Sequence, residues 1–140
     1  MAEGFGMWRS DDGGRNWRHL GLKDTRHITR IIIHPKNPEI VWVTALGHLF
    51  GTNEERGIFK TIDGGKTWKK VLFVNNNAGA IDMIMEPGNP GTFYASTWRV
   101  RRTPYSLESG GEGSAIWKST DGGETWINLM DKKGLPKKNL

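Results

Sequence analysis

The chain has 140 residues, of which 36% are hydrophobic and 25% are charged, a balance typical of one folded domain rather than a disordered chain. It contains no cysteine, which excludes disulfide scaffolds, thiolate zinc sites and thiol catalysis, and no apolar run reaches the ~18 residues that a membrane span needs. Lys and Arg number 20 against 15 Asp and Glu; this small excess favours acidic partners only weakly and gives no reason to expect nucleic acid.

The glycine and tryptophan content favours strands over helices. There are 19 glycines and seven tryptophans, but only two tyrosines. Glycine destabilises helix interiors, and tryptophan prefers pleated, half-buried surfaces, so we expect an all-β fold. The first eight residues contain neither a basic stretch nor an apolar one, so we expect no targeting signal there, and the residues alone leave the compartment open.

Two motifs recur along the chain with one period. Residues 10–17 (SDDGGRNW) return as 61–68 (TIDGGKTW) and as 119–126 (STDGGETW), with the shared aspartates 51 and then 58 positions apart. Residues 35–38 (PKNP) return as 87–90 (PGNP), 52 positions later. A period near ~50 residues is typical of repeat architectures, among them β-propellers.

The segments around these motifs alternate apolar and polar residues, as half-buried strands do. Four-stranded meanders at this period are typical of propeller blades. We therefore expect a β-propeller segment of two and a half blades: a half blade (1–22), two blades (27–74 and 79–131) and a basic tail (132–140). In chain order the predicted strands are 5–10, 16–20, 28–33, 40–46, 57–61, 67–74, 81–85, 92–98, 115–119 and 125–130.

The repeated turns have the chemistry of structural fasteners. In each one the aspartate can accept hydrogen bonds from its own turn, the glycine pair supplies positive φ, and the hydroxyl ties the incoming strand to the turn. A site built three times at a regular period is rarely catalytic, and one carboxylate per loop is too few for calcium. The predicted structural residues, whose tryptophans we expect in the core, are Ser10, Asp12, Gly14, Trp17, Thr61, Asp63, Gly65, Trp68, Ser119, Asp121, Gly123 and Trp126.

These fasteners resemble the Asp-box, or BNR, repeat, whose pattern is Ser or Thr, any residue, Asp, any residue, Gly, any residue, Thr, Trp. Longer phrases at 34–38, 45–57 and 98–105 resemble the sortilin-type branch of these propellers, often labelled glycosyl-hydrolase-like in bacteria. The resemblance implies a large propeller that is secreted or periplasmic and that binds ligands rather than turning them over. The chain departs from it in having two and a half predicted blades and no cysteine module.

Alternating strand directions send successive connections to opposite rims of a blade. The fasteners and the Pro-x-Asn-Pro turns share one rim. The other rim collects the connections between blades (21–27 and 75–79) and the two longest loops (47–56 and 99–113). Long loops on a rigid scaffold commonly carry function, so we expect the ligand site on this second rim.

The long-loop rim is rich in arginine, carboxylate and aromatic residues. The guanidinium fork matches the geometry of a carboxylate, which suits an acidic sugar or a peptide, and Trp98 is the candidate for stacking on a sugar. The alternative interpretation is a hydrated, partly flexible loop. The candidate ligand-binding residues are His48, Glu54, Glu55, Arg56, Trp98, Arg99, Arg101, Arg102, Tyr105 and Glu108.

A carbohydrate-active enzyme is the competing interpretation. Sialidases share the Asp-box propeller, but the chain lacks their Arg-Ile-Pro segment ahead of the first blade. Glycoside hydrolysis needs two carboxylates facing across a cleft, and the sequence does not place such a pair. Histidine spacings fit no metal pair. We therefore predict a non-catalytic scaffold without catalytic residues, cofactor or metal; the alternative is a glycoside hydrolase, sialidase-like or otherwise, or a fragment of one. The carboxylates in question are Glu54, Glu55, Glu108 and Glu112.

The innermost predicted strands of the two blades carry opposite charges at equivalent positions. A shift of 52 residues superposes Arg30 on Asp82 and His34 on Glu86. Unpaired charges near the channel of a propeller are costly to desolvate. We therefore expect Arg30 and Asp82 to interact, directly or through water.

Two and a half blades cannot close a ring by themselves. The faces of the end blades and the strand edge of the half blade would be exposed, and such surfaces tend to associate. The expected partners are therefore a second copy of the chain or further blades of a longer chain, besides a peptide or glycan ligand. Neither nucleic acid nor a membrane is expected.

Overall fold

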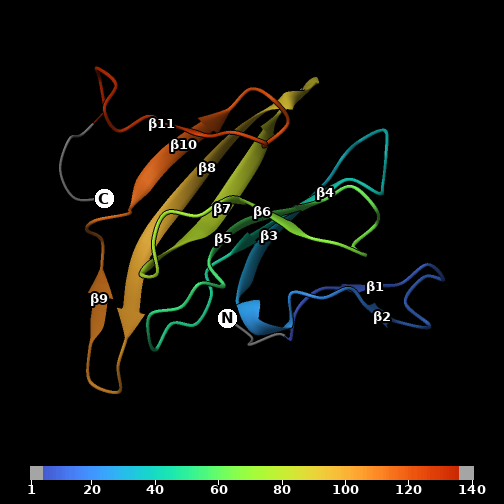
Figure 1. Ribbon diagram of the computed structural model, residues 1–140, viewed down its shortest axis with the longest axis horizontal. Coiled ribbons are helices and arrows are strands. Elements are labelled where there is room, and N and C mark those ends of the chain that lie inside the picture. Colours follow the sequence, from blue (N-terminus) through green and yellow to red (C-terminus); the bar gives the residue numbers. More distant parts are fainter. Residues whose placement is uncertain (1–4, 136–140) are drawn as a thin grey trace.

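The computed structural model describes residues 5–135, and antiparallel strands make up most of it (Figure 1). The strands form a pair, β1–β2, and two four-stranded sheets in the orders β3–β4–β5–β6 and β7–β8–β10–β11, with β9 added at the end of β8. The all-β fold and the repeated four-stranded meander are therefore confirmed. The bounds are β1 Trp8–Arg9, β2 Arg18–His19, η1 (a 3₁₀ turn) Lys23–Thr25, β3 Ile28–Ile33, β4 Val41–Ala45, β5 Gly57–Thr61, β6 Lys69–Leu72, β7 Ala78–Glu86, β8 Asn89–Arg102, β9 Leu107–Ser109, β10 Ala115–Ser119 and β11 Ile127–Asn128.

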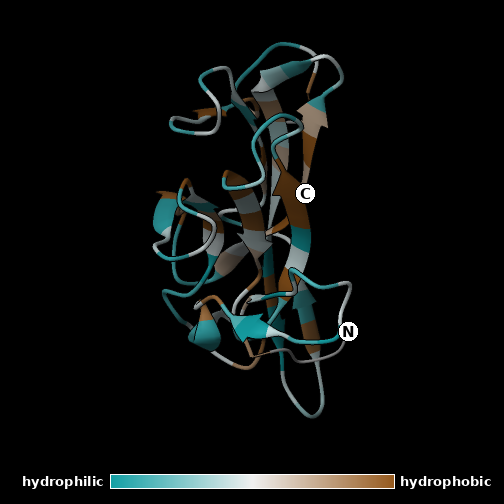
Figure 2. Ribbon diagram, turned by 90° about the vertical axis from the view of Figure 1, so that its right-hand side faces the viewer, coloured by the Kyte–Doolittle hydropathy of each residue, from teal (hydrophilic) through white to brown (hydrophobic). Residues whose placement is uncertain are grey.

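The core lies between the two four-stranded sheets, where the apolar strand segments coloured brown in Figure 2 meet. The ring of Trp42 on β4 lies 4.7 Å from the ring of Phe93 on β8, and Phe93 lies 6.5 Å from Trp126. Ile58 of β5 and Met83 of β7 are fully buried in the same cluster. Large apolar side chains from both sheets thus exclude water from this junction, which is the main source of its stability.

The first strand of the β3–β6 sheet has one covered face and one open face. Ile32 packs against the core, whereas Ile31 and Ile33 are 48% and 57% exposed. Successive side chains of a strand point to opposite faces of its sheet. The face of β3 that carries Ile31 and Ile33 is therefore uncovered within residues 5–135.

The outer strands begin later than predicted. The sequence pattern predicted strands at 16–20, 67–74 and 125–130, but β2, β6 and β11 start two residues further on. The reason is that residues 16, 67 and 125 donate both backbone and side-chain hydrogen bonds to the aspartate of their own Asp box. These residues belong to the turn and not to the strand that follows it.

The predicted loop 99–113 is mostly a β-hairpin. β8 continues to Arg102 instead of ending at Trp98, and β9 pairs with its extension, with Arg101 opposite Glu108. Thr103 closes the hairpin, because its hydroxyl accepts hydrogen bonds from the backbone N–H groups of Tyr105 and Ser106. Such Ser/Thr turns form tight reversals without glycine, so the hairpin lacks the usual glycine signal at its tip.

The β1–β2 pair is the least buried part of the described chain. Trp17 is 61% exposed, so the prediction that it lies in the core is wrong. Trp68 and Trp126 are half-buried; Trp68 donates a hydrogen bond to the carbonyl of Leu20 in the preceding unit, at 2.5 Å. Within residues 5–135 no strand precedes β1, so Trp17 has no preceding unit to pack against.

Hydrogen bonds place the turns on two opposite rims, as predicted. Gly64 N–H donates to the carbonyl of Glu39 at 3.0 Å, and Gly122 N–H donates to that of Gly91 at 2.8 Å, so the second and third Asp boxes each contact the first hairpin of their own sheet near its turn. On the other rim, Asn53 N–H donates to the carbonyl of Asn76 at 3.0 Å. Figure 1 shows the β8–β9 hairpin reaching out at the end away from the β7–β8 turn and the third Asp box.

The predicted contact between Arg30 and Asp82 is confirmed. Arg30 Nε donates to Asp82 Oδ1 at 2.7 Å, which joins β3 to β7. The hydrogen bond raises the pKa of Arg30 and lowers the pKa of Asp82. Both side chains are 49% exposed, so water screens the pair and its contribution to stability is small.

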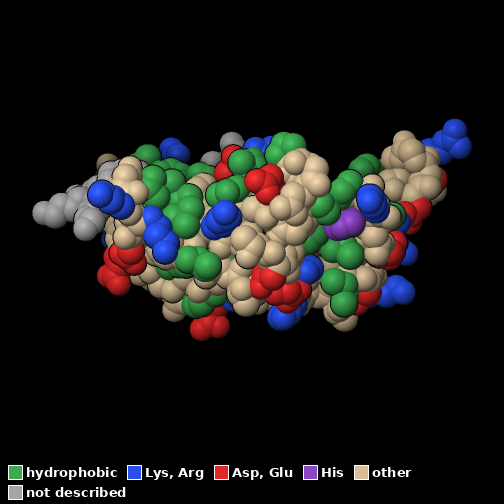
Figure 3. All heavy atoms as spheres, turned by 90° about the horizontal axis from the view of Figure 1, so that it is seen from above, with side chains coloured by type: hydrophobic (Ala, Val, Ile, Leu, Met, Phe, Trp, Pro, Cys, Tyr) green, Lys and Arg blue, Asp and Glu red, His purple; other side chains and the backbone are tan. Residues whose placement is uncertain are grey.

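The charged side chains of the surface are mixed in sign. Figure 3 looks onto the side of the tight turns, where Lys and Arg side chains alternate with Asp and Glu among apolar patches. No helix among the described residues is long and apolar enough to cross a membrane. Residues 136–140 of the predicted basic tail lie outside the described residues.

Candidate functional site

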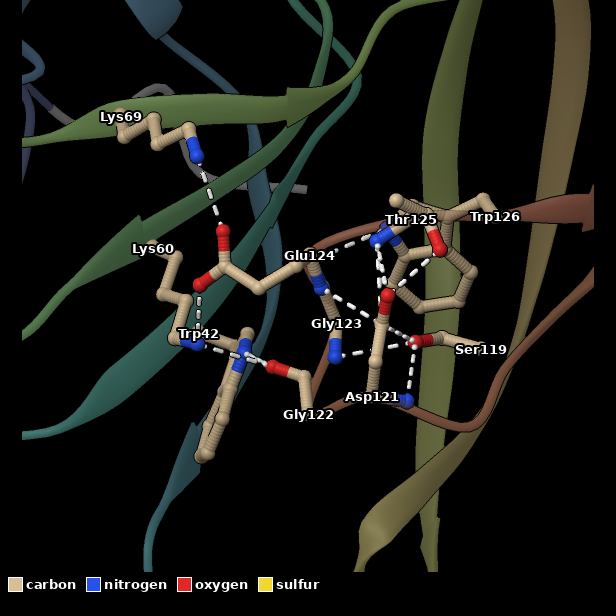
Figure 4. A network of polar contacts seen from close by, with 10 residues as sticks. All are labelled: Trp42, Lys60, Lys69, Ser119, Asp121, Gly122, Gly123, Glu124, Thr125 and Trp126. Atoms are coloured by element: carbon tan, nitrogen blue, oxygen red, sulfur yellow. Dashed lines mark hydrogen bonds and ion pairs between the residues drawn. The ribbon is translucent and has the colours of Figure 1, made fainter.

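The three Asp boxes form the same hydrogen-bond network. In each box the Ser or Thr hydroxyl donates to the aspartate, at 2.8 Å, and accepts from the N–H of the second glycine, at 2.8 to 2.9 Å. The aspartate accepts from the backbone N–H and the side chain of the residue four positions later. Figure 4 shows this arrangement for Ser119, Asp121, Gly123 and Thr125. The hydroxyl and the carboxylate are thus engaged within their own turn.

These hydrogen bonds hold the aspartates in the ionised form. Bonds from the backbone and side chain of Asn16 and from Ser10 lower the pKa of Asp12 to about 2. Bonds from Thr67 and Thr125 lower the pKa of Asp63 and of Asp121 in the same way. An ionised carboxylate only accepts hydrogen bonds and has no proton to give near neutral pH. The chemistry of the boxes therefore suits turn formation and not general acid catalysis.

The β8–β9 hairpin fixes three of the candidate residues. Arg99 Nη2 lies 3.1 Å from Glu108 Oε2, and Arg99 Nη1 donates to the carbonyl of Gly110 at 3.2 Å. Trp98 Nε1 donates to Ser109 Oγ at 3.0 Å. The half-buried Trp98 lies within β8, which continues to Arg102, and the prediction that it ends its strand is wrong. These side chains are positioned by the register of the hairpin and are not loop residues.

The tip of the hairpin presents exposed apolar side chains. Tyr105 is 98% exposed and Leu107 is 58% exposed. Arg101 and Arg102 are also exposed, on the last residues of β8. Two guanidinium groups therefore lie on the same short hairpin as an aromatic and an aliphatic side chain.

Arg56 is not a surface residue, in contrast to the prediction. Its side chain is 1% exposed, and Nη2 donates to the carbonyls of His48, at 2.5 Å, and Gly51, at 3.1 Å. Burial lowers the pKa of Arg56. Gly47, at φ 71°, faces it so closely that an added Cβ would come within 2.6 Å of Arg56 Cγ. Arg56 thus organises the loop 47–56 from inside instead of facing a ligand.

The remaining candidates of this loop lie at its surface. Glu54 is exposed, and His48 and Glu55 are half-buried. Asn53 holds the loop together, because its Nδ2 donates to the carbonyls of His48 and Gly51, both at 3.0 Å. The backbone carbonyl of Glu54 accepts from Lys70 Nζ. The loop is therefore ordered by its own polar groups.

A pocket of about 340 Å³ opens beside the loop 47–56. Arg26 is part of its wall and has φ 49° and ψ −57°, a sparsely populated backbone conformation for a residue other than glycine, of a kind that often marks functional positions. Sequence reasoning placed the connection 21–27 on this rim but singled out none of its residues, since nothing in the pattern marks positive φ at an arginine. The lining residues are Arg26, His27, His48, Leu49, Phe50, Gly51, Thr52 and Asn53.

The hairpin and the loop form one surface. Arg102 N–H donates to the carbonyl of Leu49 at 2.9 Å, so the end of β8 is tied to the wall of the pocket. We call this surface, made of residues 26–27, 47–56 and 98–110, the loop rim. It joins the end of β8, with Arg101 and Arg102, to the loop that carries His48, and Arg56 is buried within that loop. As consecutive strand residues, Arg101 and Arg102 point to opposite faces of the hairpin.

A larger groove, of about 500 Å³, lies between the β1–β2 pair and the open face of β3. Ile31, Ile33, Trp17 and Trp68 contribute apolar walls to it. In the other junction of the molecule the corresponding space is filled by the inner strands of a sheet. Among the described residues the first unit has no inner strands, and the groove occupies the space that such strands would fill. It is not part of the loop rim.

No group of three or more His, Cys, Asp or Glu side chains suited to a metal ion occurs within residues 5–135. The histidines illustrate why. His27 is 4% exposed and its Nδ1 hydrogen-bonds with the carbonyl of Gly47 at 2.8 Å. His19 stacks edge-on against Trp8, with ring centroids 4.8 Å apart.

Solved structures with the same fold are glycoside hydrolase family 74 (GH74) enzymes. An ancestral GH74 enzyme matches 89% of the chain with a TM-score of 0.65 and 18% identity. The GH74 xyloglucanase from Xanthomonas campestris matches 94% with a TM-score of 0.63 and 19% identity. The GH74 enzyme from Niastella koreensis matches 89% with a TM-score of 0.62 and 18% identity. At these identities the likeness shows the propeller fold alone.

The chain spans only 15%, 20% and 18% of the lengths of these three enzymes. No curated protein matches it. The family model described as Sortilin, neurotensin receptor 3, matches residues 6–134, which is nearly the whole chain. The repeated Asp boxes, the four-stranded sheets and this match lead to one conclusion: the chain belongs to the Sortilin-Vps10 family of Asp-box β-propellers.

Proposed function

We propose that the chain is a non-catalytic scaffold that binds a ligand on its loop rim. The observation that carries this proposal is the hydrogen bond from Arg102 N–H to the carbonyl of Leu49, which ties the β8–β9 hairpin to the wall of the 340 Å³ pocket. Connections that a rigid β-scaffold holds in place are the usual sites of binding. The family description names a receptor, which supports binding rather than turnover.

The side chains of the loop rim suit a ligand with a carboxylate and an apolar part. Arg101 and Arg102 are exposed at the end of β8, and the guanidinium group binds carboxylates with two parallel hydrogen bonds. Tyr105 and Phe50, 98% and 63% exposed, offer aromatic surface on which a sugar ring or an apolar side chain can stack. We therefore propose a peptide or an acidic glycan as the ligand.

Isothermal titration tests this proposal with three probes: short peptides with a free C-terminal carboxylate, the same peptides as C-terminal amides, and uronic acid oligosaccharides. We expect binding to the carboxylate-bearing probes and at least about ten-fold weaker binding to the amides, because the arginines lose their partner. The double variant Arg101→Gln, Arg102→Gln should lose this discrimination. Lys132→Gln is the matched control, since Lys132 is an exposed cation outside the loop rim. Equal affinity for acid and amide would contradict the proposal.

A fragment of a glycoside hydrolase is the second candidate function. The observation in its favour is that the chain matches GH74 enzymes, one of them a xyloglucanase, over 89% to 94% of its length. Release of reducing sugar from xyloglucan distinguishes the two candidates. We expect no release above that of a heat-unfolded sample. Release that disappears when Glu54, Glu55, Glu108 and Glu112 are changed to Gln would favour the hydrolase.

We further propose that the chain works together with additional blades and outside the cytoplasm, in the periplasm or after secretion. The open face of β3 and the exposed Trp17 support the first part, because apolar surfaces of this kind favour association. Membership of the Sortilin-Vps10 family supports the second part. Sedimentation of the full chain at micromolar concentration tests the first: a mass above 15.8 kDa supports it, and a monomer that unfolds cooperatively would contradict it.

A further inference from the structure

Arg56 is a buried cation without an acidic partner. Its side chain is 1% exposed, and among residues 5–135 it makes no ion pair. Its Nε and Nη1 atoms are buried and have no hydrogen-bond partner within that range either. A buried charge that neither water nor a counterion compensates is costly. A negative charge close to the loop 47–56 would lower this cost.

The loop 47–56 turns two of its carbonyl groups inward, toward this cation. His48 and Gly51 supply these carbonyls, and each of the two accepts hydrogen bonds from two donors. The donors are Nη2 of Arg56 and Nδ2 of Asn53. Hydrogen bonds in a chain polarise one another, so a peptide group whose carbonyl is held by a cation has a stronger N–H donor at its other end.

The other ends of these two peptide groups are the N–H groups of Leu49 and Thr52. The C=O and N–H bonds of a trans peptide point in opposite directions, and none of the described peptide bonds is cis. Both N–H groups therefore point away from Arg56. Neither has a hydrogen-bond partner among the described residues, and Leu49 and Thr52 both line the 340 Å³ pocket. Two unused backbone donors thus belong to its wall.

The wall of this pocket carries basic side chains, and within the described part of the chain no acidic residue lines it. Arg26, His27 and His48 contribute to the wall, whereas the glutamates at 54–55 do not. Backbone N–H groups in a concave, positively charged site commonly bind anions. The volume is that of a small-ligand pocket, which leaves room for the larger group that carries the anion. Phe50, 63% exposed, offers this group an apolar surface.

We propose that the pocket binds an oxyanion, the sulfate, phosphate or carboxylate group of a ligand, with the N–H groups of Leu49 and Thr52 as donors and Arg56 as the buried positive charge behind them. Arg56 is a positioning residue, because it acts through the two peptide groups and does not contact the anion. The site is separate from Arg101 and Arg102, on which the proposed binding of a carboxylate depends. It therefore goes beyond the proposed function, and each can be tested without the other.

Titration of the full 15N-labelled chain with sodium sulfate, sodium phosphate and sodium acetate, at constant ionic strength in sodium chloride, tests the proposal. We expect saturable shifts of the amide signals of Leu49 and Thr52 with at least one of these salts, and the anion that binds most tightly identifies the group. The salts contain neither peptide nor sugar. Their binding in the absence of any binding by the peptide and glycan probes would support this site and contradict the proposed function alone.

Thr52→Pro removes one of the two donors at an exposed position. We expect it to bind the anion at least about ten-fold more weakly than Thr52→Val, because a hydrogen bond to a charged group is lost. Thr52→Val is the matched variant, since it keeps the backbone N–H and loses only the hydroxyl. Equal affinities of the two variants would contradict the role of the backbone donor.

Arg56→Lys and Arg56→Met form a second pair, which differs in charge. Where both spectra show the native fold, we expect the lysine variant to bind at least about five-fold more tightly than the methionine variant, because only lysine keeps a buried positive charge behind the pocket. A purely structural role of Arg56 would give the two variants the same affinity. The absence of saturable shifts at Leu49 and Thr52 with all three salts would overturn the proposal without any variant.

Discussion

Thr61 is buried, at 2% exposed, and its hydroxyl both donates to Asp63 and accepts from the N–H of Gly65. Thr61→Val keeps the shape of the side chain but leaves that N–H, which is buried, without a partner. We expect the free energy of unfolding to fall by about 1–3 kcal/mol. Urea unfolding measures this change.

Thr120→Val is the matched control, because Thr120 is an exposed residue of the third Asp box at a position that takes no part in the network. We expect it to change the free energy of unfolding by less than about 0.5 kcal/mol. Equal effects of the two substitutions would show that the hydroxyl network does not stabilise the fold.

The pKa of Asp12 is lowered to about 2, and those of Asp63 and Asp121 are lowered as well. An aspartate with a folded-state pKa below its unfolded value of about 3.9 stabilises the fold above that value and loses this effect as the pH falls through the folded pKa. We therefore expect the urea midpoint to drop steeply between about pH 4 and 2. Asp63→Asn should flatten this slope, since one of the three groups no longer titrates. An unchanged slope would refute the assignment.

Residue patterns predicted the Asp boxes but not the direction of single side chains. The hydroxyl, aspartate and glycine act within one turn, so their bonds follow from the local sequence. Arg56 and Trp17 depend on what packs around them: the first is covered by its own loop, and the second has no preceding unit. The burial of these two side chains depends on tertiary packing, which cannot be predicted from a single sequence.

At the scale of elements, Trp42 of β4 is the anchor of the junction between the two four-stranded sheets. It is 2% exposed, packs on Phe93 and donates to the carbonyl of Gly122. We expect Trp42→Ala to cost about 3–5 kcal/mol because it opens a cavity there. Trp17→Ala, at a 61% exposed position, should cost far less. Calorimetric melting compares the two; similar losses would mean that Trp17 is buried in solution.

The strands that could be predicted are those flanked by turns with a glycine or proline signal. β3, β5 and β10 have the predicted bounds, because the turns beside them carry such signals. The extension of β8 and its partner β9 were missed, because their turn has no glycine and is closed by the side-chain hydroxyl of Thr103, and Pro104 by itself did not indicate a hairpin. The position of segment 99–113 on the rim opposite the Asp boxes was therefore predicted correctly, but its hairpin structure was not.

At the scale of the whole molecule, the period of the repeat predicted the number of units, because it depends only on spacing along the chain. It did not predict the pocket beside residues 47–56, which arises where the blade connection at Arg26 meets that loop. The apolar groove beside the β1–β2 pair and the open face of the last sheet agree with the predicted number of units, since within residues 5–135 no further sheet covers either of them.

The central claim is that the loop rim binds the ligand while the Asp boxes only hold the blades together. The most direct measurement is a map of amide chemical shifts in the 15N-labelled chain during titration with the tightest-binding probe of the peptide and glycan set. We expect the shifts to cluster in residues 26–27, 47–56 and 98–110 and to spare 10–17, 61–68 and 119–126. Shifts concentrated in the Asp boxes, or in the groove beside β1–β2, would contradict it.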